Sequence, residues 1–291
     1  MSRLPRSLLL PVVAAAVLSL AACSSGTGAT VADGETAPHQ EQSGALPGEH
    51  VHGVARDPGD GKVYLATHQG LFRYDQGGPV RVGPIVDIMG FSIAGPGRFY
   101  ASGHPSEGVD LPAPLGLMET RDAGRTWAVR SRGGESDFHA LTSSSMGVLG
   151  YDGALTSTAD GKTWKKLAIT SEPRSLAATP DGSRILATTA SGVLLSRDQG
   201  ATWAAMPTAP QLLLAAWADN TTAAGVTRTG ALAVSTDAGK TWTTGKARVD
   251  SAQALSATKT GGGTLEVLVV TDAAILRSLD SGASISPVGT S

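Results

Sequence analysis

The sequence predicts an all-β fold, a six-bladed β-propeller, from a short motif, its spacing and the composition of the chain. An eight-residue motif recurs along the chain, and its glycine returns at intervals of roughly 40 residues. That interval fits a blade of four short antiparallel strands. Glycine is abundant, with 37 residues in a chain of 291, which suits tight turns between strands. The predicted propeller spans residues 49–291, with blades at 50–82, 87–130, 137–167, 174–206, 212–245 and 252–288.

The motif reads Ser/Thr-x-Asp-x-Gly-x-Thr-Trp and is complete around Asp122, Asp198 and Asp237. An aspartate in a turn can accept hydrogen bonds from the backbone N–H groups that follow it, and glycine permits the positive φ of such a turn. We expect the tryptophan ring to be buried between neighbouring blades. Residues that recur in almost every blade are therefore predicted to be structural rather than catalytic. They are Asp122, Gly124, Trp127, Asp160, Gly161, Trp164, Asp198, Gly200, Trp203, Asp237, Gly239, Trp242, Asp280 and Gly282.

Three copies of the motif depart from this pattern. In blade three Ala159 holds the aspartate position and Asp160 follows it. In blade six Ile285 replaces the tryptophan, and blade one keeps only Asp75 and Gly77. The pattern resembles the Asp-box, or BNR repeat, of sialidases, sortilin-type receptors and many bacterial surface propellers. This resemblance implies the same propeller fold.

Residues 1–22 have the features of a lipoprotein signal peptide. Two arginines precede an apolar stretch at 7–20, which is too short to cross a membrane comfortably. The segment closes on Leu-Ala-Ala followed by Cys23. This ending resembles the bacterial lipobox, in which the cysteine becomes the lipidated first residue of the mature protein. An ordinary signal peptide followed by a coincidental cysteine is the alternative interpretation.

Residues 23–48 are predicted to be the lipidated Cys23 and a disordered tether, because their small and polar side chains bury too little surface to fold. Cys23 is the only cysteine, so no intrachain disulfide can form. Its acyl chains would anchor the protein to the bacterial cell membrane on the extracytoplasmic side. The net charge is −2 and the basic residues are scattered, which argues against nucleic-acid binding. We expect a monomer.

The histidines of the predicted propeller share one end of it. If first strands start at the top of each blade, the turns after second strands also lie at the top, and the motif turns lie at the bottom. We call this top end the upper rim. Five histidines occupy starts of first strands or ends of second strands in blades one to three, and no histidine lies in blades four to six. They are His50, His52, His68, His104 and His139.

These histidines are predicted to bind a ligand or a divalent transition metal. His50 and His52 alternate along a strand, so both imidazoles project to the same side. Imidazoles combined with carboxylates suit Zn, Cu, Ni or Fe, although no fixed ligand spacing identifies one metal. The alternative is that each histidine pairs with an acid or a carbonyl group and helps to close the ring.

Carboxylates predicted on the same rim provide an enzymatic alternative. Asp87, Glu135 and Asp137 are the candidate catalytic residues, and Asp110 lies in an insertion at 105–114. Two such groups could serve a glycoside hydrolase of sialidase-like fold. A true sialidase needs three arginines and a tyrosine activated by a glutamate. Three rim arginines are available, but no tyrosine–glutamate pair is evident; the arginines are Arg132, Arg174 and Arg228.

Several segments together resemble a group of bacterial lipoproteins that are classed as glycosylhydrolase-like, sialidase-related Asp-box proteins. This resemblance covers almost all of residues 49–288 and implies little about activity, because a fold hosts many functions. We favour a lipid-anchored propeller that binds a metal, a glycan or a protein partner at the upper rim. The alternatives are glycoside hydrolysis and a role in assembly or repair, similar to that of the plant and cyanobacterial photosystem propellers. The segments are 50–53, 66–71, 87–91, 102–105, 114–117 and 134–139.

Overall fold

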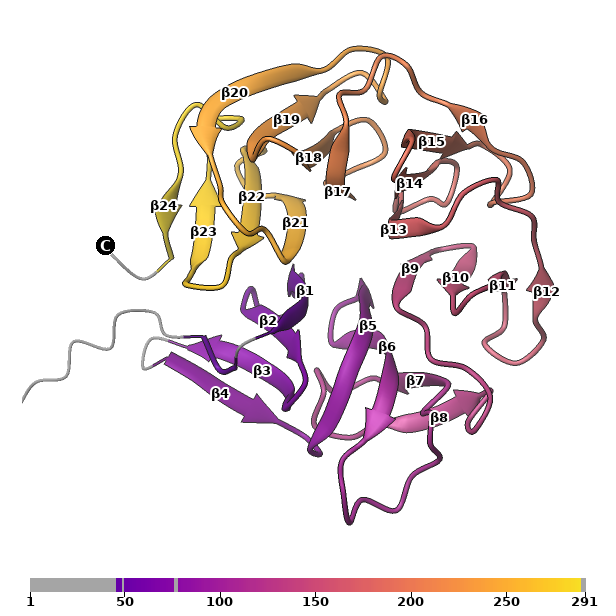
Figure 1. Ribbon diagram of the computed structural model, residues 1–291. Coiled ribbons are helices and arrows are strands. Elements are labelled where there is room, and N and C mark those ends of the chain that lie inside the picture. The colour runs from indigo at the N-terminus through magenta and orange to yellow at the C-terminus, as the bar shows by residue number, and fades with distance from the viewer. Residues whose placement is uncertain (1–45, 49, 76–77, 289–291) are drawn as a thin grey trace, which may run out of the picture. The chain divides into compact units, whose positions relative to one another are not determined.

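The computed structural model describes residues 46–48, 50–75 and 78–288, and all regular elements of these residues are β-strands. They form six sheets of four consecutive antiparallel strands (Figure 1). The first three blades are β1 (Val51–Arg56), β2 (Val63–Thr67), β3 (Gly70–Asp75), β4 (Gly78–Val82); β5 (Val86–Gly95), β6 (Arg98–Pro105), β7 (Leu117–Thr120), β8 (Ala128–Ser131); and β9 (Ala140–Ser144), β10 (Gly147–Tyr151), β11 (Leu155–Thr158), β12 (Lys165–Lys166). The last three are β13 (Pro173–Ala178), β14 (Ile185–Thr189), β15 (Gly192–Ser196), β16 (Ala204–Ala205); β17 (Leu212–Trp217), β18 (Ala223–Thr227), β19 (Ala231–Ser235), β20 (Thr243–Arg248); and β21 (Ala254–Lys259), β22 (Leu265–Val270), β23 (Ile275–Ser278), β24 (Ser286–Pro287).

The first strands of the six blades surround a common centre. β1 contacts β5, β5 contacts β9, and the contacts continue through β13 and β17 to β21, which returns to β1. Figure 1 shows these strands innermost, with the last blade beside the first. The predicted six-bladed propeller is therefore confirmed. Each sheet takes its strands from one stretch of chain, so no sheet of the described residues combines strands from both ends.

Apolar side chains fill the space between neighbouring blades. The core divides into six clusters, and each cluster combines residues of two adjacent blades. The motif tryptophans of blades two to five each pack against the cluster shared with the preceding blade, as does Ile285 of blade six. An apolar ring at this position thus joins its own blade to the one before it.

The contact between blades six and one combines apolar packing with a partly buried ion pair. The cluster here joins Val54 and Leu65 of blade one to Leu268 of blade six. Arg56 donates from Nε and Nη2 to the two carboxylate oxygens of Glu266, at 2.6 and 2.8 Å. The Glu266 side chain is only 4% exposed, so this bidentate pair is largely shielded from water. Packing and this ion pair together close the ring.

The turns after the third strands are organised by their aspartates. In blade four the Asp198 carboxylate accepts the Thr202 backbone N–H at 2.8 Å and the Thr202 hydroxyl at 2.6 Å. The Ser196 hydroxyl donates to the same carboxylate and accepts the Gly200 N–H. Gly200 adopts a φ of 86°, which favours glycine. Blades two, five and six repeat this arrangement around Asp122, Asp237 and Asp280.

Blade three makes the same turn with one residue fewer. The hydroxyl that donates to Asp160 and accepts the Gly161 N–H belongs to Thr158, whereas the eight-residue motif counted back from Trp164 places Ser157 in that role. Asp160 accepts the N–H groups of Lys162 and Thr163. The apparent displacement of the aspartate therefore results from a one-residue deletion between the aspartate and the glycine, which makes Asp160 and Gly161 adjacent.

The predictions for residues 1–45, including the lipidation of Cys23, lie outside the described residues, as does Gly77. Leu46, within the range predicted for the tether, packs against the cluster between blades six and one. No helix among the described residues is long and apolar enough to cross a membrane.

If packing closes the ring, the stability of the protein should depend equally on the closing interface and on an interface elsewhere in the ring. Leu65 lies between blades six and one and Leu186 between blades four and five, and both are fully buried. We expect Leu65→Ala and Leu186→Ala each to lower the free energy of unfolding by about 2–5 kcal/mol, measured by urea denaturation. A much smaller loss for Leu65→Ala would show that the closing interface is loosely packed.

The turn aspartates predict a loss of stability in acid. Hydroxyl and backbone N–H donors lower the pKa of Asp198, Asp237 and Asp280 from 3.8 to about 2. These carboxylates therefore add stability above pH 4 that is lost as the pH falls towards 2. We expect the triple Asp→Asn variant to be less stable than wild type at pH 6, with a difference that shrinks towards pH 2. Urea unfolding between pH 6 and 2 measures it, and a constant difference would contradict the role of the charge.

Candidate functional site

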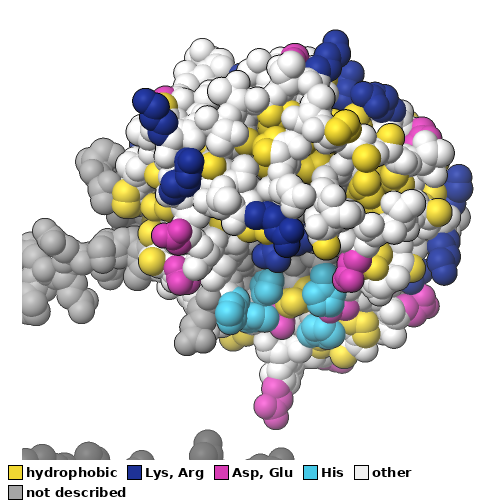
Figure 2. Space-filling view, turned by 45° about the horizontal axis from the view of Figure 1, so that its top comes forward, with side chains coloured by type: hydrophobic (Ala, Val, Ile, Leu, Met, Phe, Trp, Pro, Cys, Tyr) yellow, Lys and Arg dark blue, Asp and Glu magenta, His cyan; other side chains and the backbone are white. Residues whose placement is uncertain are grey.

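All five histidines of the propeller lie on the upper rim. His50 precedes β1 and His52 lies within it, His68 follows β2, His104 lies near the end of β6, and His139 precedes β9. Figure 2 shows histidine side chains gathered in one patch of this face, beside basic and acidic side chains. The structure divides them into two groups, each built around one aspartate.

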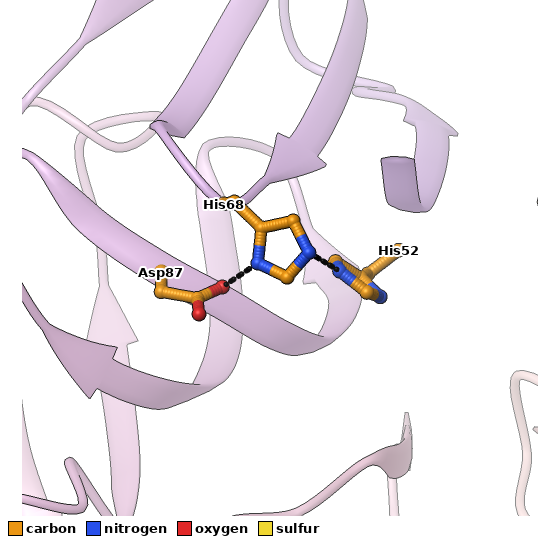
Figure 3. Close-up of side chains that lie close together, drawn as sticks. All are labelled: His52, His68 and Asp87. Atoms are coloured by element: carbon orange, nitrogen blue, oxygen red, sulfur yellow. Dashed lines mark hydrogen bonds and ion pairs between the residues drawn. The ribbon is translucent and has the colours of Figure 1, made fainter. Parts of the chain in front are cut away.

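The first group is a row of three side chains, Asp87, His68 and His52 (Figure 3). His68 Nδ1 lies 2.8 Å from Asp87 Oδ1, and His68 Nε2 lies 3.1 Å from His52 Nε2. The nearest ligand atoms of the three residues all lie within 4.8 Å of one another. The His50 ring meets the His68 ring edge-on, with 5.5 Å between centroids. Four rim side chains thus converge in one place.

The hydrogen bonds of this row determine the tautomer of His68. An ionised carboxylate only accepts, so His68 Nδ1 carries the proton that is donated to Asp87. The Nε2 of a neutral His68 then presents a lone pair towards His52. A carboxylate that fixes an imidazole in this way is the usual support of a metal-binding histidine.

His52 is partly buried, whereas the His68 next to it is exposed. Burial lowers the pKa of His52 below its ordinary value of 6.5, and the nearby His68 lowers this pKa further, while Asp87 raises it. The imidazole is therefore neutral near pH 7, the state in which a ring nitrogen can bind a metal.

The second group joins His104, Asp137 and His139. His104 Nε2 lies 2.9 Å from Asp137 Oδ2, and His139 Nε2 lies 3.4 Å from the same oxygen. The other carboxylate oxygen, Asp137 Oδ1, is buried and has no hydrogen-bond partner among the described residues. Both histidines are exposed, so the group opens to solvent.

The two histidine–aspartate pairs occupy equivalent places in the propeller. In each pair the histidine stands at the end of the second strand of one blade, and the aspartate at the start of the next blade. His68–Asp87 joins blades one and two, and His104–Asp137 joins blades two and three. The alternative interpretation of these histidines was that each pairs with an acid or a carbonyl group and helps to close the ring. The His68–Asp87 and His104–Asp137 pairs, which join neighbouring blades, agree with this interpretation. His52, which contacts His68 and carries no such pair, is what distinguishes the first group.

The remaining rim candidates do not join these groups. Glu135 and Asp110 are exposed, and within the described residues neither carboxylate has a hydrogen bond or ion pair. Arg132 lies 3.7 Å from Asp152, and Arg228 donates to Gln211 Oε1 at 3.2 Å. Arg174 lines a cavity at the centre of the rim, which the other two arginines do not line. The structure therefore does not bring together the three rim arginines that a true sialidase would need.

The central cavity has a volume of about 300 Å³ and contains residues that the sequence did not mark as functional. His52, His139 and Arg174 line it together with Met89 and Gln253. Met89 and Gln253 occupy the place in their own blades that His52 occupies in blade one. These residues could have been found in the sequence, because each lies two positions after the residue equivalent to His50 in its blade. The equivalence of the blades at this position becomes clear only when their structures are aligned.

No family model matches the sequence, and no curated protein is similar to it by sequence. Solved structures are similar in fold at low identity. A GH74 enzyme of Niastella koreensis is 17% identical, with a TM-score of 0.55 over 82% of this chain and 37% of that one. An ancestral GH74 enzyme is 12% identical, with a TM-score of 0.53 over 84% of this chain and 38% of that one. This chain thus spans less than half of the GH74 enzymes.

Two propellers of similar length are also similar in fold. YCF48 from Cyanidioschyzon merolae is 13% identical, with a TM-score of 0.52 over 80% of this chain and 97% of that one. YCF48 bound to D1 peptide is 17% identical, with a TM-score of 0.50 over 84% of each chain. At these identities the comparisons support the β-propeller fold and do not transfer an activity.

The enclosure of His52 predicts its titration. Two-dimensional NMR of labelled histidine should give a pKa below 6.5 for His52 in metal-free protein, because burial disfavours the charged imidazole. His68→Gln removes a neighbouring titratable imidazole that lowers the His52 pKa, and it should therefore raise this pKa part of the way to 6.5. His104→Gln, in the second group, is the control and should leave the His52 pKa unchanged. A His52 pKa at or above 6.5 in the wild type would contradict this assignment.

Proposed function

We propose that the protein is a lipid-anchored, extracytoplasmic β-propeller that binds a divalent transition metal at its upper rim. The metal ligands are His52 Nε2 and His68 Nε2, and Asp87 orients His68 from the side away from the metal. The observation that carries this proposal is the row of three side chains, in which two imidazole nitrogens face each other 3.1 Å apart. The anchor is Cys23, on the strength of the lipobox resemblance.

The distance between the two nitrogens fits shared coordination. Zinc–imidazole bonds of about 2.0–2.1 Å in a tetrahedral site place two nitrogen ligands a little over 3 Å apart. His68 can give the metal only one nitrogen, and its Nδ1 already faces Asp87 at 2.8 Å. Coordination through Nε2 keeps this hydrogen bond and therefore needs no rearrangement of Asp87.

The site would leave coordination positions open to a ligand. Two imidazoles fill half of a tetrahedral shell, and the His50 ring lies beside His68, with 5.5 Å between ring centroids. An incomplete shell at an accessible rim suits capture of a ligand or partner by the metal, rather than a purely structural role. Imidazole donors select Zn, Cu, Ni or Fe over Mg and Ca.

Glycoside hydrolysis has weaker support. Asp87 and Asp137 each lie within 3 Å of a histidine nitrogen, and Glu135 lies outside both groups. The GH74 enzymes share the fold, but this chain spans 37–38% of their length. A protein partner remains the second candidate function, because a propeller matched over 84% of its length is described as bound to a peptide.

Metal binding is tested with Zn²⁺ and Cu²⁺ on purified protein. We expect one metal ion per chain by elemental analysis and a rise in Tm on metal addition. His52→Ala/His68→Ala should abolish both effects. Asp87→Asn should weaken binding about 10- to 100-fold, as the loss of an orienting carboxylate does elsewhere.

The control is His104→Ala, which removes a rim histidine outside the first group and should leave the metal content unchanged. Absence of bound metal, with no change in Tm, would refute the proposal. Turnover of aryl glycosides that disappears in Asp137→Asn would instead establish the hydrolase.

A further inference from the structure

Five of the six blades contribute one side chain each, from equivalent positions, to the mouth of the central cavity. In blades one, two, four and five this residue sits where the pairing of the first and second strands slips by one residue. Such a β-bulge leaves the residue unpaired and changes the direction of its side chain. The six residues are His52, Met89, His139, Arg174, Leu213 and Gln253, and all except Leu213 line the cavity.

Below this mouth lies an apolar ring. Two positions further along each first strand, a second set of equivalent residues lines both this cavity and a deeper one beneath it. They therefore lie between the two cavities and form the floor of the upper one. The six residues are Val54, Phe91, Leu141, Leu176, Ala215 and Leu255. We call the upper cavity, with its polar mouth and apolar floor, the central cup.

The central cup carries positive charge without an acid to balance it. None of the residues that line it is an aspartate or a glutamate. Arg56 and Arg98 make ion pairs elsewhere with Glu266 and Glu119. The Arg174 guanidinium, in contrast, has neither an ion pair nor a hydrogen bond among the described residues. Its five N–H donors are free to bind an anion that enters the cup.

We propose that the central cup binds a small carboxylic acid with an apolar body. The planar guanidinium of Arg174 matches a carboxylate in two parallel hydrogen bonds, which favours a carboxylate at the mouth. The apolar body of the ligand would rest on the floor around Phe91 and Leu176. The volume of about 300 Å³ equals that of roughly ten water molecules and admits an acid the size of benzoate or hexanoate.

This proposal does not depend on the metal. Arg174 lies in blade four, and the proposed metal ligands lie in blade one. The two sites share only His52, which lines the cup and contacts His68. Carboxylate binding can therefore be measured on protein that has been freed of metal with EDTA.

The test is isothermal titration of metal-free protein with benzoate and hexanoate. We expect both acids to bind with 1:1 stoichiometry, and acetate to bind more weakly because it lacks the apolar body. Benzamide has the same shape without the charge and should show no binding. Arg174→Gln should weaken benzoate binding about tenfold or more, since a hydrogen-bonded charge is lost. Arg174→Lys should restore only part of the affinity, because lysine cannot bind in the bidentate geometry.

Arg228→Gln is the matched control, since it removes another exposed rim arginine that does not line the cup. It should leave benzoate affinity unchanged. Arg174 has no partner in the fold, so the Tm of Arg174→Gln should match that of the wild type, and a lower affinity then reports the site itself. Absence of benzoate binding, equal binding of benzamide, or full affinity in Arg174→Gln would each overturn the proposal. None of these results would bear on metal binding at His52 and His68.

Discussion

The structure depends on burying the apolar faces that each blade turns towards its neighbours. A four-stranded sheet with two apolar faces is not stable in water unless both faces are covered, and a ring covers all of them. The six clusters between blades are this covering, and every blade takes part in two of them. The ring also has to end where it began. Here Arg56 and Glu266 add a shielded ion pair to apolar packing, at the one contact that the order of the chain does not provide.

The same ring explains why both proposed sites lie at one end. Turns after third strands are occupied by aspartates whose hydrogen bonds hold the backbone, so the lower end is committed to structure. On the upper rim, equivalent positions hold different side chains in different blades. Blade one places His52 at the mouth of the central cup, and blade four places Arg174 at the equivalent position. A single scaffold position thus supplies an imidazole in one blade and a guanidinium in another.

The sequence predicted the blades and the rim because both depend on local patterns. A motif of eight residues marks one end of each blade, and alternation of strand direction then assigns His68 and His104 to the opposite end. The pairing of His68 with Asp87 was beyond the sequence, because it depends on how two blades are rotated against each other. Arg174 was noticed only as one of three arginines. Its isolation from acids is a property of the cavity, and no pattern along the chain records it.

The one-residue difference in blade three has a similar origin. The sequence aligned Ser157 with the serines and threonines of other blades, because the count to the tryptophan is then equal. The strand pairing places Thr158 opposite Val148, where Ser196 of blade four stands opposite Ile185. Hydrogen bonding selects the register, and the shorter turn follows from it. The hydroxyl that donates to the aspartate therefore identifies equivalent residues of two blades more reliably than the spacing of the motif does.

His52 connects the two proposed sites, and this connection has an electrostatic consequence. A metal on His52 and His68 would place positive charge at the mouth of a cup that already contains the Arg174 guanidinium. No acid lines the cup, so the two cations would repel each other until an anion enters. A carboxylate in the cup would relieve this repulsion, and by linkage each ligand would then strengthen the binding of the other by the same factor. Burial lowers the pKa of His52, so its imidazole is neutral near pH 7 and does not oppose the approach of a metal ion.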